Sequence, residues 1–279
     1  MSRSLALSSL ALAAGLVLLG AGCASSAPSA APTSADGSSS VPALVATRPG
    51  ETGAPAMSAC AHPYYPLKQG YNVRYRISSR DFQGAPQVTH YNQRVTSADA
   101  NSVTLTTQFE DTTGATTFSA DQALRCDGGH LRATAYVDFS SQLMGGAAPA
   151  FRTETRNVTG DLLPADLQVG SDWTGSFAVT MTPANAAAEN APLGRGIDLT
   201  IRTHRRVVGE ETVTVPAGTY QALKIQAETG MDGIAGGSEN TDLVTTEWWV
   251  RGVGLVKSVF AAGGAMGDIV TEASSINVP

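Results

Sequence analysis

The stretch that decides the fold reads Glu211-Thr-Val-Thr-Val215, then Pro216-Ala217-Gly218, then Thr219-Tyr-Gln-Ala-Leu-Lys-Ile225. Its two arms alternate apolar or β-branched residues with polar ones, which is the period-two pattern of a half-buried strand. Proline fixes φ for a turn, and the glycine two residues later permits a positive φ. The segment therefore predicts a β-hairpin with a tight connection.

The same alternation recurs on both sides of this hairpin, and turn residues separate the segments at intervals of roughly 8 to 15 residues. The candidate strands are residues 71–78, 87–96, 102–110, 130–139, 173–181, 197–208, 220–227, 241–250, 254–261 and 268–273. No segment has a capped 3.6-residue period, and residues 139–144 predict at most one helical turn. We expect a mainly β fold: a single curved antiparallel sheet, a partly open β-barrel or a sandwich.

The N-terminus has the three-part layout of an export signal. Arg3 is its only charge, an apolar run rich in Leu and Ala covers residues 5–19, and small residues precede Cys23. This layout predicts a signal peptide over residues 1–22. The apolar run is shorter than the about 20 residues that a membrane-spanning helix needs, and serines interrupt it.

Leu19-Gly20-Ala21-Gly22-Cys23 resembles the bacterial lipobox, which implies cleavage before Cys23 and its acylation with diacylglycerol and an N-acyl chain such as palmitate. Gly20 stands where lipoboxes usually have Leu, so ordinary secretion with an unmodified Cys23 is the alternative. Because Ala24 rather than Asp follows the cysteine, the resemblance implies an anchor in the outer membrane, facing the periplasm, if the organism has one.

The segment after the cysteine, residues 23–59, is rich in Ser, Ala and Pro. A chain of this composition cannot bury enough apolar surface to offset its ordering entropy, so we expect a disordered tether. Behind it, residues 60–279 form a single all-β domain in our prediction, because no internal linker divides them.

Three cysteines occur in the chain, and setting Cys23 aside leaves Cys60 and Cys126. An even pair in an oxidising compartment predicts a disulfide. Such a bond would constrain a loop of about 65 residues and stabilise the domain by several kcal/mol in the chain-entropy model. Two buried free thiols are the alternative.

Three motifs follow one another along the domain: Tyr65-Pro-Leu-Lys-Gln-Gly70, Val215-Pro-Ala-Gly-Thr-Tyr-Gln-Ala-Leu-Lys224 and Trp248-Trp-Val-Arg-Gly-Val-Gly-Leu-Val-Lys257. In this order they resemble the TapB-like family of bacterial envelope proteins, whose function is unknown. The resemblance covers residues 63–260. It implies an exported, mostly β protein, and some family members are associated by name with type IV pili. It supplies no catalytic residues.

The sequence contains no pattern that predicts catalysis, a cofactor or a metal. His62, His90, His130 and His204 are scattered, without the spacing of a metal site, and no Gly-x-Ser-x-Gly elbow occurs. The net charge is −6, and Arg205-Arg206 is the densest basic pair. Nucleic acid is therefore an unsuitable partner. We predict a protein without catalytic residues, cofactors or metal ligands.

Trp248 and Trp249 are the candidate binding surface. Because they are consecutive, one faces the core of a strand and the other faces outward or into a cavity. An exposed outer tryptophan beside other apolar residues would mark a binding surface, whereas a covered one would be ordinary packing.

These observations favour a non-catalytic envelope lipoprotein that is held to the membrane by its N-terminal lipid and binds or scaffolds another envelope component. The alternative is a carrier of a lipid or another apolar ligand in a half-open β cup, and an enzyme comes third. A dry, continuous apolar cavity would favour the carrier, and a filled core with an exposed apolar patch would favour partner binding. A cluster of acids, His or Ser in a cleft would favour the enzyme.

Overall fold

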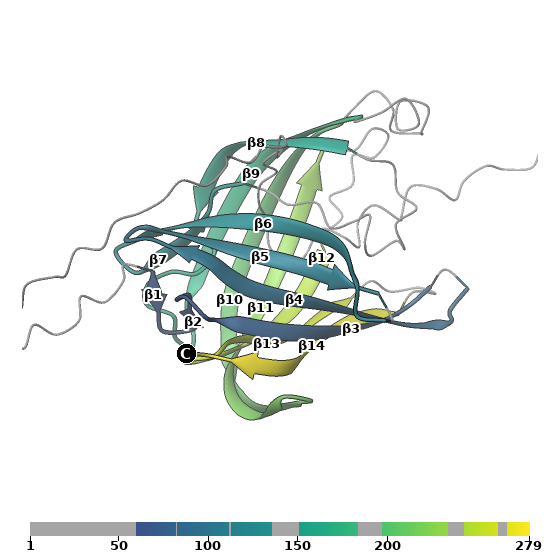
Figure 1. Ribbon diagram of the computed structural model, residues 1–279. Helices are drawn as coiled ribbons and strands as arrows, with labels where there is room; N and C mark the ends of the chain where they lie inside the picture. Colours follow the sequence, from purple (N-terminus) through teal and green to yellow (C-terminus); the bar gives the residue numbers. More distant parts are fainter. Residues whose placement is uncertain are drawn as a thin grey trace, which may run out of the picture.

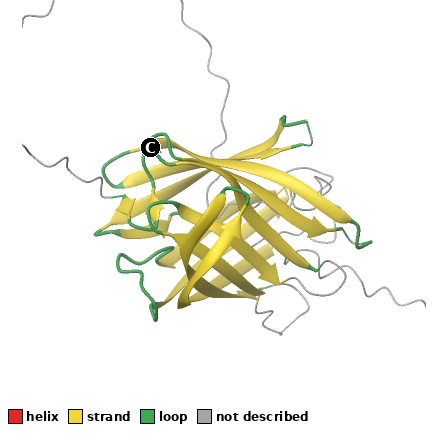
Figure 2. Ribbon diagram, turned by 90° about the horizontal axis from the view of Figure 1, so that it is seen from below, coloured by secondary structure: helices red, strands yellow, loops and turns green. Residues whose placement is uncertain are grey.

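The computed structural model describes residues 60–81, 83–111, 113–135, 151–183, 197–233, 243–261 and 267–279. The signal peptide and tether expected over residues 1–59, Cys23 included, lie outside the described residues, and so does the helical turn expected at residues 139–144. The regular secondary structure of the described part is all β-strand, as Figure 2 shows. No helix among these residues is both long and apolar enough to cross a membrane.

The strands are β1 (Ala61–His62), β2 (Tyr65–Pro66), β3 (Asn72–Arg80), β4 (Pro86–Ala98), β5 (Ser102–Glu110), β6 (Thr116–Asp127), β7 (His130–Ala133), β8 (Phe151–Gly160), β9 (Asp172–Pro183), β10 (Ile197–Val215), β11 (Gly218–Asp232), β12 (Leu243–Val250), β13 (Gly254–Ala261) and β14 (Asp268–Asn277).

Twelve of these strands form one antiparallel sheet in the order β7-β6-β5-β4-β3-β14-β13-β12-β11-β10-β9-β8. Apart from the β3–β14 pair, neighbours in the sheet are consecutive in the chain. The sheet curls until its two halves face each other and it nearly closes into a barrel (Figure 1). The mainly β prediction is therefore confirmed, and its form is the partly open barrel.

The hairpin predicted at residues 211–225 is also confirmed. β10 and β11 pair from Val215 and Gly218 at the turn to Thr200 and Asp232 at the far end. Gly218 has φ 145°, a backbone conformation that L side chains rarely adopt. A bulge between Val207 and Gly209 interrupts the pairing and bends the hairpin.

Aromatic side chains fill much of the space that the sheet encloses, because alternate residues of each strand point inward. Tyr75 and Tyr91 stack with ring centroids 4.8 Å apart, and Tyr91 and Phe109 stack at 5.3 Å. Tyr65 meets Trp249 edge-on at 5.3 Å. Burial raises the pKa of Tyr75 well above its ordinary value, and its hydroxyl donates to the backbone oxygen of Leu255 at 2.8 Å.

The edge strand β7 meets the segment that follows the other edge strand, β8, through a short seam. Leu131 N donates to Leu163 O at 2.9 Å, and Leu162 N donates to Leu131 O at 2.7 Å. Beside this bridge, the carboxylate of Asp161 accepts from His130 Nδ1 at 2.6 Å and from Arg132 Nε at 2.8 Å. One isolated bridge and the two contacts to Asp161 thus stand where a closed barrel would have a ladder.

The N-terminal segment, residues 60–67, forms a cap at the end of the sheet where the C-terminus also lies (Figure 1). It contains the small β1–β2 pair, and Gly252 N donates to Pro63 O at 2.7 Å. Cys60 and Cys126 form a disulfide whose Cα atoms are 4.9 Å apart, with a sequence separation of 66. A cross-link of that span removes about 4 kcal/mol of unfolded-chain entropy in the loop-closure model.

His62 fastens the cap to the segment after β8. Its Nδ1 accepts from Tyr64 N at 3.1 Å, so the proton of the neutral ring is on Nε2, which donates to Pro164 O at 2.9 Å. Burial is the main cause that lowers the pKa of His62, and the positive charges of His130 and Arg251 lower it further. The lowered pKa therefore favours the neutral imidazole in the folded protein.

We predict that His62 makes the fold less stable as the pH falls below about 6.5, because the unfolded chain then takes up a proton more readily than the folded one. In urea unfolding at pH 7.5 and pH 5, the stability advantage of the wild type over His62→Gln should shrink at the lower pH.

His204→Gln provides the control of opposite sign. The hydrogen bond to Asp172 raises the pKa of His204, so the stabilisation that this histidine contributes is present at low pH and lost as the pH rises. The wild-type advantage over this variant should grow between pH 7.5 and pH 5. A pH-independent advantage over His62→Gln would contradict the prediction.

Candidate binding site inside the sheet

The two candidate tryptophans lie on opposite faces of β12, as expected for consecutive strand residues. Trp249 points inward, is 1% exposed, and its Nε1 donates to Glu247 Oε2 at 2.8 Å. Trp248 points outward, and its Nε1 donates to Glu211 Oε1 at 2.6 Å. The ammonium groups of Lys224 and Lys257 lie 5.5 and 5.8 Å from the Trp248 ring centroid.

The β10–β11 hairpin explains why Trp248 is covered although it faces outward. The bent hairpin curls back along the outside of the sheet (Figure 1), and Ala217 N at its tip donates to Ala273 O on β14 at 3.0 Å. Trp248 is consequently only 9% exposed. The structure thus contains no exposed tryptophan surface at Trp248 and Trp249, and the packing alternative describes both residues.

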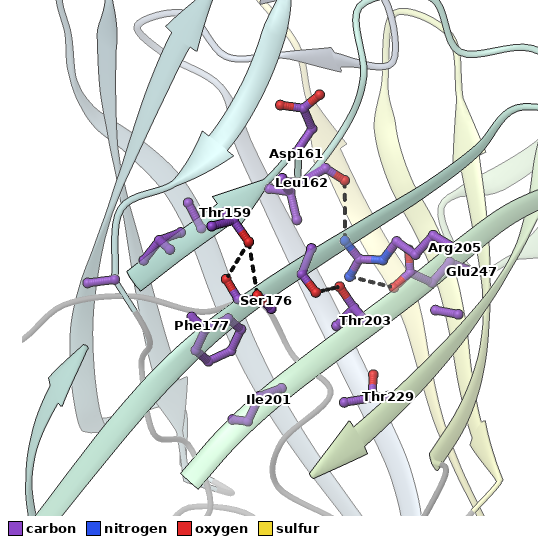
Figure 3. Close-up of a pocket in the computed structure, with 16 residues that line it drawn as sticks. Thr159, Asp161, Leu162, Ser176, Phe177, Ile201, Thr203, Arg205, Thr229 and Glu247 are labelled. Atoms are coloured by element: carbon purple, nitrogen blue, oxygen red, sulfur yellow. Dashed lines mark hydrogen bonds and ion pairs between the residues drawn. The ribbon is translucent and has the colours of Figure 1, made fainter. Parts of the chain in front are cut away.

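A cavity of about 80 Å³ lies on the inner face of β8 to β12, next to the seam (Figure 3). Leu162, Phe177 and Ile201 contribute its apolar wall, and an ion pair between Arg205 and Glu247 lies at one side. No pattern in the sequence indicated this site. Arg205 appeared there only as half of a basic pair.

Strand register explains how these charges come to be inside. Arg205 has the same parity on β10 as the buried Leu199, Ile201 and Val207, so it points inward while Arg206 points outward. Its neighbour on β11 is Ala227, whose small side chain leaves room above the sheet. A parity count along residues 199–207 would have placed Arg205 in the interior.

The Arg205–Glu247 pair is buried but incompletely hydrogen-bonded. The two side chains are 12% and 7% exposed, and Arg205 Nη2 lies 3.7 Å from Glu247 Oε1. That separation is longer than a hydrogen bond. Arg205 Nη1 donates to Leu162 O at 3.2 Å, whereas its buried Nε has no hydrogen-bond partner among the described residues. A buried ion pair is costly unless further hydrogen bonds complete it.

A second, shallower hollow of about 460 Å³ lies on the outer face of β9 to β11 and brings together Ser176, His204 and Glu228. His204 Nε2 lies 2.9 Å from Asp172 Oδ1, and Nδ1 lies 3.8 Å from Glu228 Oε2. Both ring nitrogens therefore face carboxylates, while the Ser176 hydroxyl bonds to Thr159 at 2.9 Å. This is an ion-pair cluster rather than a serine activated by a base.

The remaining histidines do not form a metal site. His62 lies in the cap, His130 at the seam and His90 on β4, and the described residues contain no group of three or more His, Cys, Asp or Glu that could hold a metal ion. The predicted Cys23 attachment site lies outside the described residues.

The fold is an antiparallel up-and-down sheet that nearly closes into a barrel, with one short seam and an internal cavity beside it. The chain belongs to the DUF3108-like family, whose model matches residues 70–259. The match covers nearly the same residues as the motif resemblance; the TapB-like name stays a prediction.

Solved structures of similar shape come from three bacteria. A protein from Bacteroides fragilis, described as exported and as having a YmcC-like fold, is 16% identical, with a TM-score of 0.49 over 76% of this chain and 98% of its own. A protein from Parabacteroides distasonis that is described as a lipoprotein is 15% identical, with a TM-score of 0.49 over 77% of this chain and 99% of its own. The hypothetical lipoprotein YmcC from Escherichia coli K12 is 11% identical, with a TM-score of 0.33 over 80% of this chain and 90% of its own. No curated protein matches the chain.

We predict that Arg205 and Glu247 are strongly coupled in stability. Arg205→Met leaves a buried carboxylate without its cation, and Glu247→Gln leaves a buried guanidinium without its anion, so each single change should cost about 3–5 kcal/mol. The double variant should lose less than the sum. Urea unfolding of the four proteins measures this coupling.

The matched control is the Lys257–Glu272 pair, whose side chains are 23% and 22% exposed at an Nζ–Oε1 distance of 3.0 Å. Because water reaches this pair, the same cycle with Lys257→Met and Glu272→Gln should give a coupling of about 1 kcal/mol or less. Equal coupling in the two cycles would show that the interior pair has no special role.

Proposed function

We propose that this protein is a non-catalytic, exported lipoprotein of the bacterial envelope that binds or scaffolds another envelope component. The observation that carries the proposal is the filled interior. Aromatic side chains occupy much of the enclosed space, and the cavity measures about 80 Å³. Pockets that hold drug-sized ligands are about 300–1,000 Å³. A lipid needs more room than this cavity offers.

Two features support the exported location. The lipobox-like sequence ends at Cys23, and the remaining cysteines, Cys60 and Cys126, form a disulfide. Structural disulfides persist in oxidising compartments outside the bacterial cytoplasm. The proposed lipid on Cys23 would hold the membrane-facing end of the chain and leave the β domain to meet its partner.

The non-catalytic assignment is supported by the two hollows. In the outer one, the hydrogen bond to Asp172 raises the pKa of His204 and so favours the protonated ring, which has no lone pair to act as a general base. In the inner one, the carboxylate of Glu247 lies between the Arg205 guanidinium and the Trp249 indole. Neither set of residues places a nucleophile against a base.

The anchor is tested by metabolic labelling. Cells that express the full chain and receive an alkyne analogue of palmitate should yield a labelled protein, and Cys23→Ala should abolish the label while Cys60→Ser leaves it. Label that persists in Cys23→Ala would remove this cysteine as the acylation site, and an unlabelled wild type would favour ordinary secretion.

The carrier alternative is tested by the lipids that accompany the protein. Mass spectrometry of organic extracts from the full chain, purified in mild detergent and washed with detergent of a different class, should find the covalent lipid and no further lipid in stoichiometric amount. A defined lipid retained at one molecule per chain would overturn the partner-binding proposal in favour of the carrier.

A further inference from the structure

Three buried polar groups without a described hydrogen-bond partner belong to one row across the sheet. They are Trp173 Nε1, Arg205 Nε and Thr245 Oγ1. Arg205 on β10 pairs with Trp173 on β9 and with Ala227 on β11. Ala227 in turn pairs with Thr245 on β12. The row thus places its unsatisfied groups on both sides of an alanine.

Such a concentration is unusual, because buried polar groups in folded proteins are almost always hydrogen-bonded and each unpaired one is costly. Glu247, two residues after Thr245 on β12, adds a further acceptor. Its Oε2 accepts from the Trp249 indole, and its Oε1 lies 3.7 Å from Arg205 Nη2, which is longer than a hydrogen bond. The groups without a partner are therefore two N–H donors and one hydroxyl, and of these three residues Arg205 lines the cavity described above.

The cavity next to this row has both the room and the lining for a small molecule. Arg205, Ala227 and Glu247 line it, together with the apolar Phe177 and Ile201 (Figure 3). Its volume of about 80 Å³ exceeds the roughly 10–15 Å³ that one water requires. An occupant can thus set an apolar part against the apolar wall and a polar part against Arg205 and Glu247.

We propose that this cavity binds a small neutral molecule that carries a primary carboxamide. A carboxamide offers a carbonyl oxygen with two acceptor positions and an NH₂ group with two donors. The oxygen matches the unpaired N–H of Arg205, and the NH₂ group matches Glu247 Oε1, the two polar groups of this set whose residues line the cavity. The ligand is neutral because the charges of Arg205 and Glu247 already balance, and an added buried charge would have no counterion.

The inner cavity and the outer hollow lie on opposite faces of the same strands. The inner cavity and the outer hollow share Thr159, Gly175, Ser176 and Thr203 in their walls, so only these residues separate them. Gly175 contributes no side chain, and a Cβ there would already lie 3.2 Å from Thr203 Oγ1 and 3.3 Å from the Thr159 backbone oxygen.

The three tryptophans of the chain provide the test. In protein labelled with ¹⁵N-tryptophan, titration with propionamide should shift the indole N–H signals of Trp173 and Trp249 in a saturable way. Saturation is expected in the millimolar range for so small a ligand. The indole signal of Trp248, on the outer face, should stay in place and serves as the internal control. Sodium propionate, which has the same carbon skeleton and a negative charge, should produce no saturable shift.

Two variants separate the site from unspecific effects. Arg205→Met should abolish the shifts, whereas Arg206→Met, the same change on the outer face of β10, should leave them intact. Ala227→Leu fills the cavity without removing a charge, so it should also abolish binding if Arg205→Met fails to fold. A wild type without saturable shifts would mean that water alone occupies the cavity, and an equal response to propionate would exclude a site for neutral ligands. Either result overturns the proposal.

Discussion

The backbone pairing of β3 with β14 is the interaction on which the rest of the architecture depends. It joins residues 72–78 to residues 270–277, nearly the whole length of the domain apart, and closing so long a loop costs considerable chain entropy. Each other neighbouring pair in the sheet is a local hairpin or meander contact. Once β3 and β14 pair, the strands that follow β3 (β4 to β7) extend the sheet on one side. The strands that precede β14 (β13 back to β8) extend it on the other. The two edge strands, β7 and β8, therefore come from the middle of the chain. The β3–β14 pairing thus also fixes the place of the seam, of Asp161 within it and of the cavity beside it.

The sequence predicted the strands whose inward positions are large and apolar, and it missed those whose inward positions are not. β6 was missed because its inward residues include Ala120 and Gln122, which do not stand out in a period-two count. β8 was missed because Arg, Thr and Glu occupy both of its faces. β7 was expected to reach residue 139 but ends at Ala133. Edge strands such as β7 and β8 bury less than central ones, so their sequences carry a weaker pattern.

The candidate site was harder to predict than the fold, because it depends on which face a residue takes and on what lies above it. The Trp248–Trp249 pair was correctly assigned to opposite faces, but no sequence pattern indicates that a hairpin from residues 208–218 covers the outer one. The inward direction of Arg205 was readable from its neighbours Ile201 and Val207. The contact between Arg205 and Glu247 was not readable from the sequence. It depends on the register of β10, β11 and β12 and on the bulge that sets the β10–β11 pairing. Polar residues inside a sheet are thus recognised from three-dimensional pairing more than from local sequence.

The disulfide also has a mechanical consequence. Any pull on the chain from its N-terminal side enters the described domain at Cys60, in a cap whose own strands are only two residues long. The disulfide transmits part of that tension directly to β6, which is paired with β5 and β7 on either side near Cys126. The load is shared with the body of the sheet, so the cap is not peeled away first. A protein tethered at this end can therefore transmit force to its sheet while His62, and the end of the barrel that it closes, stay in place.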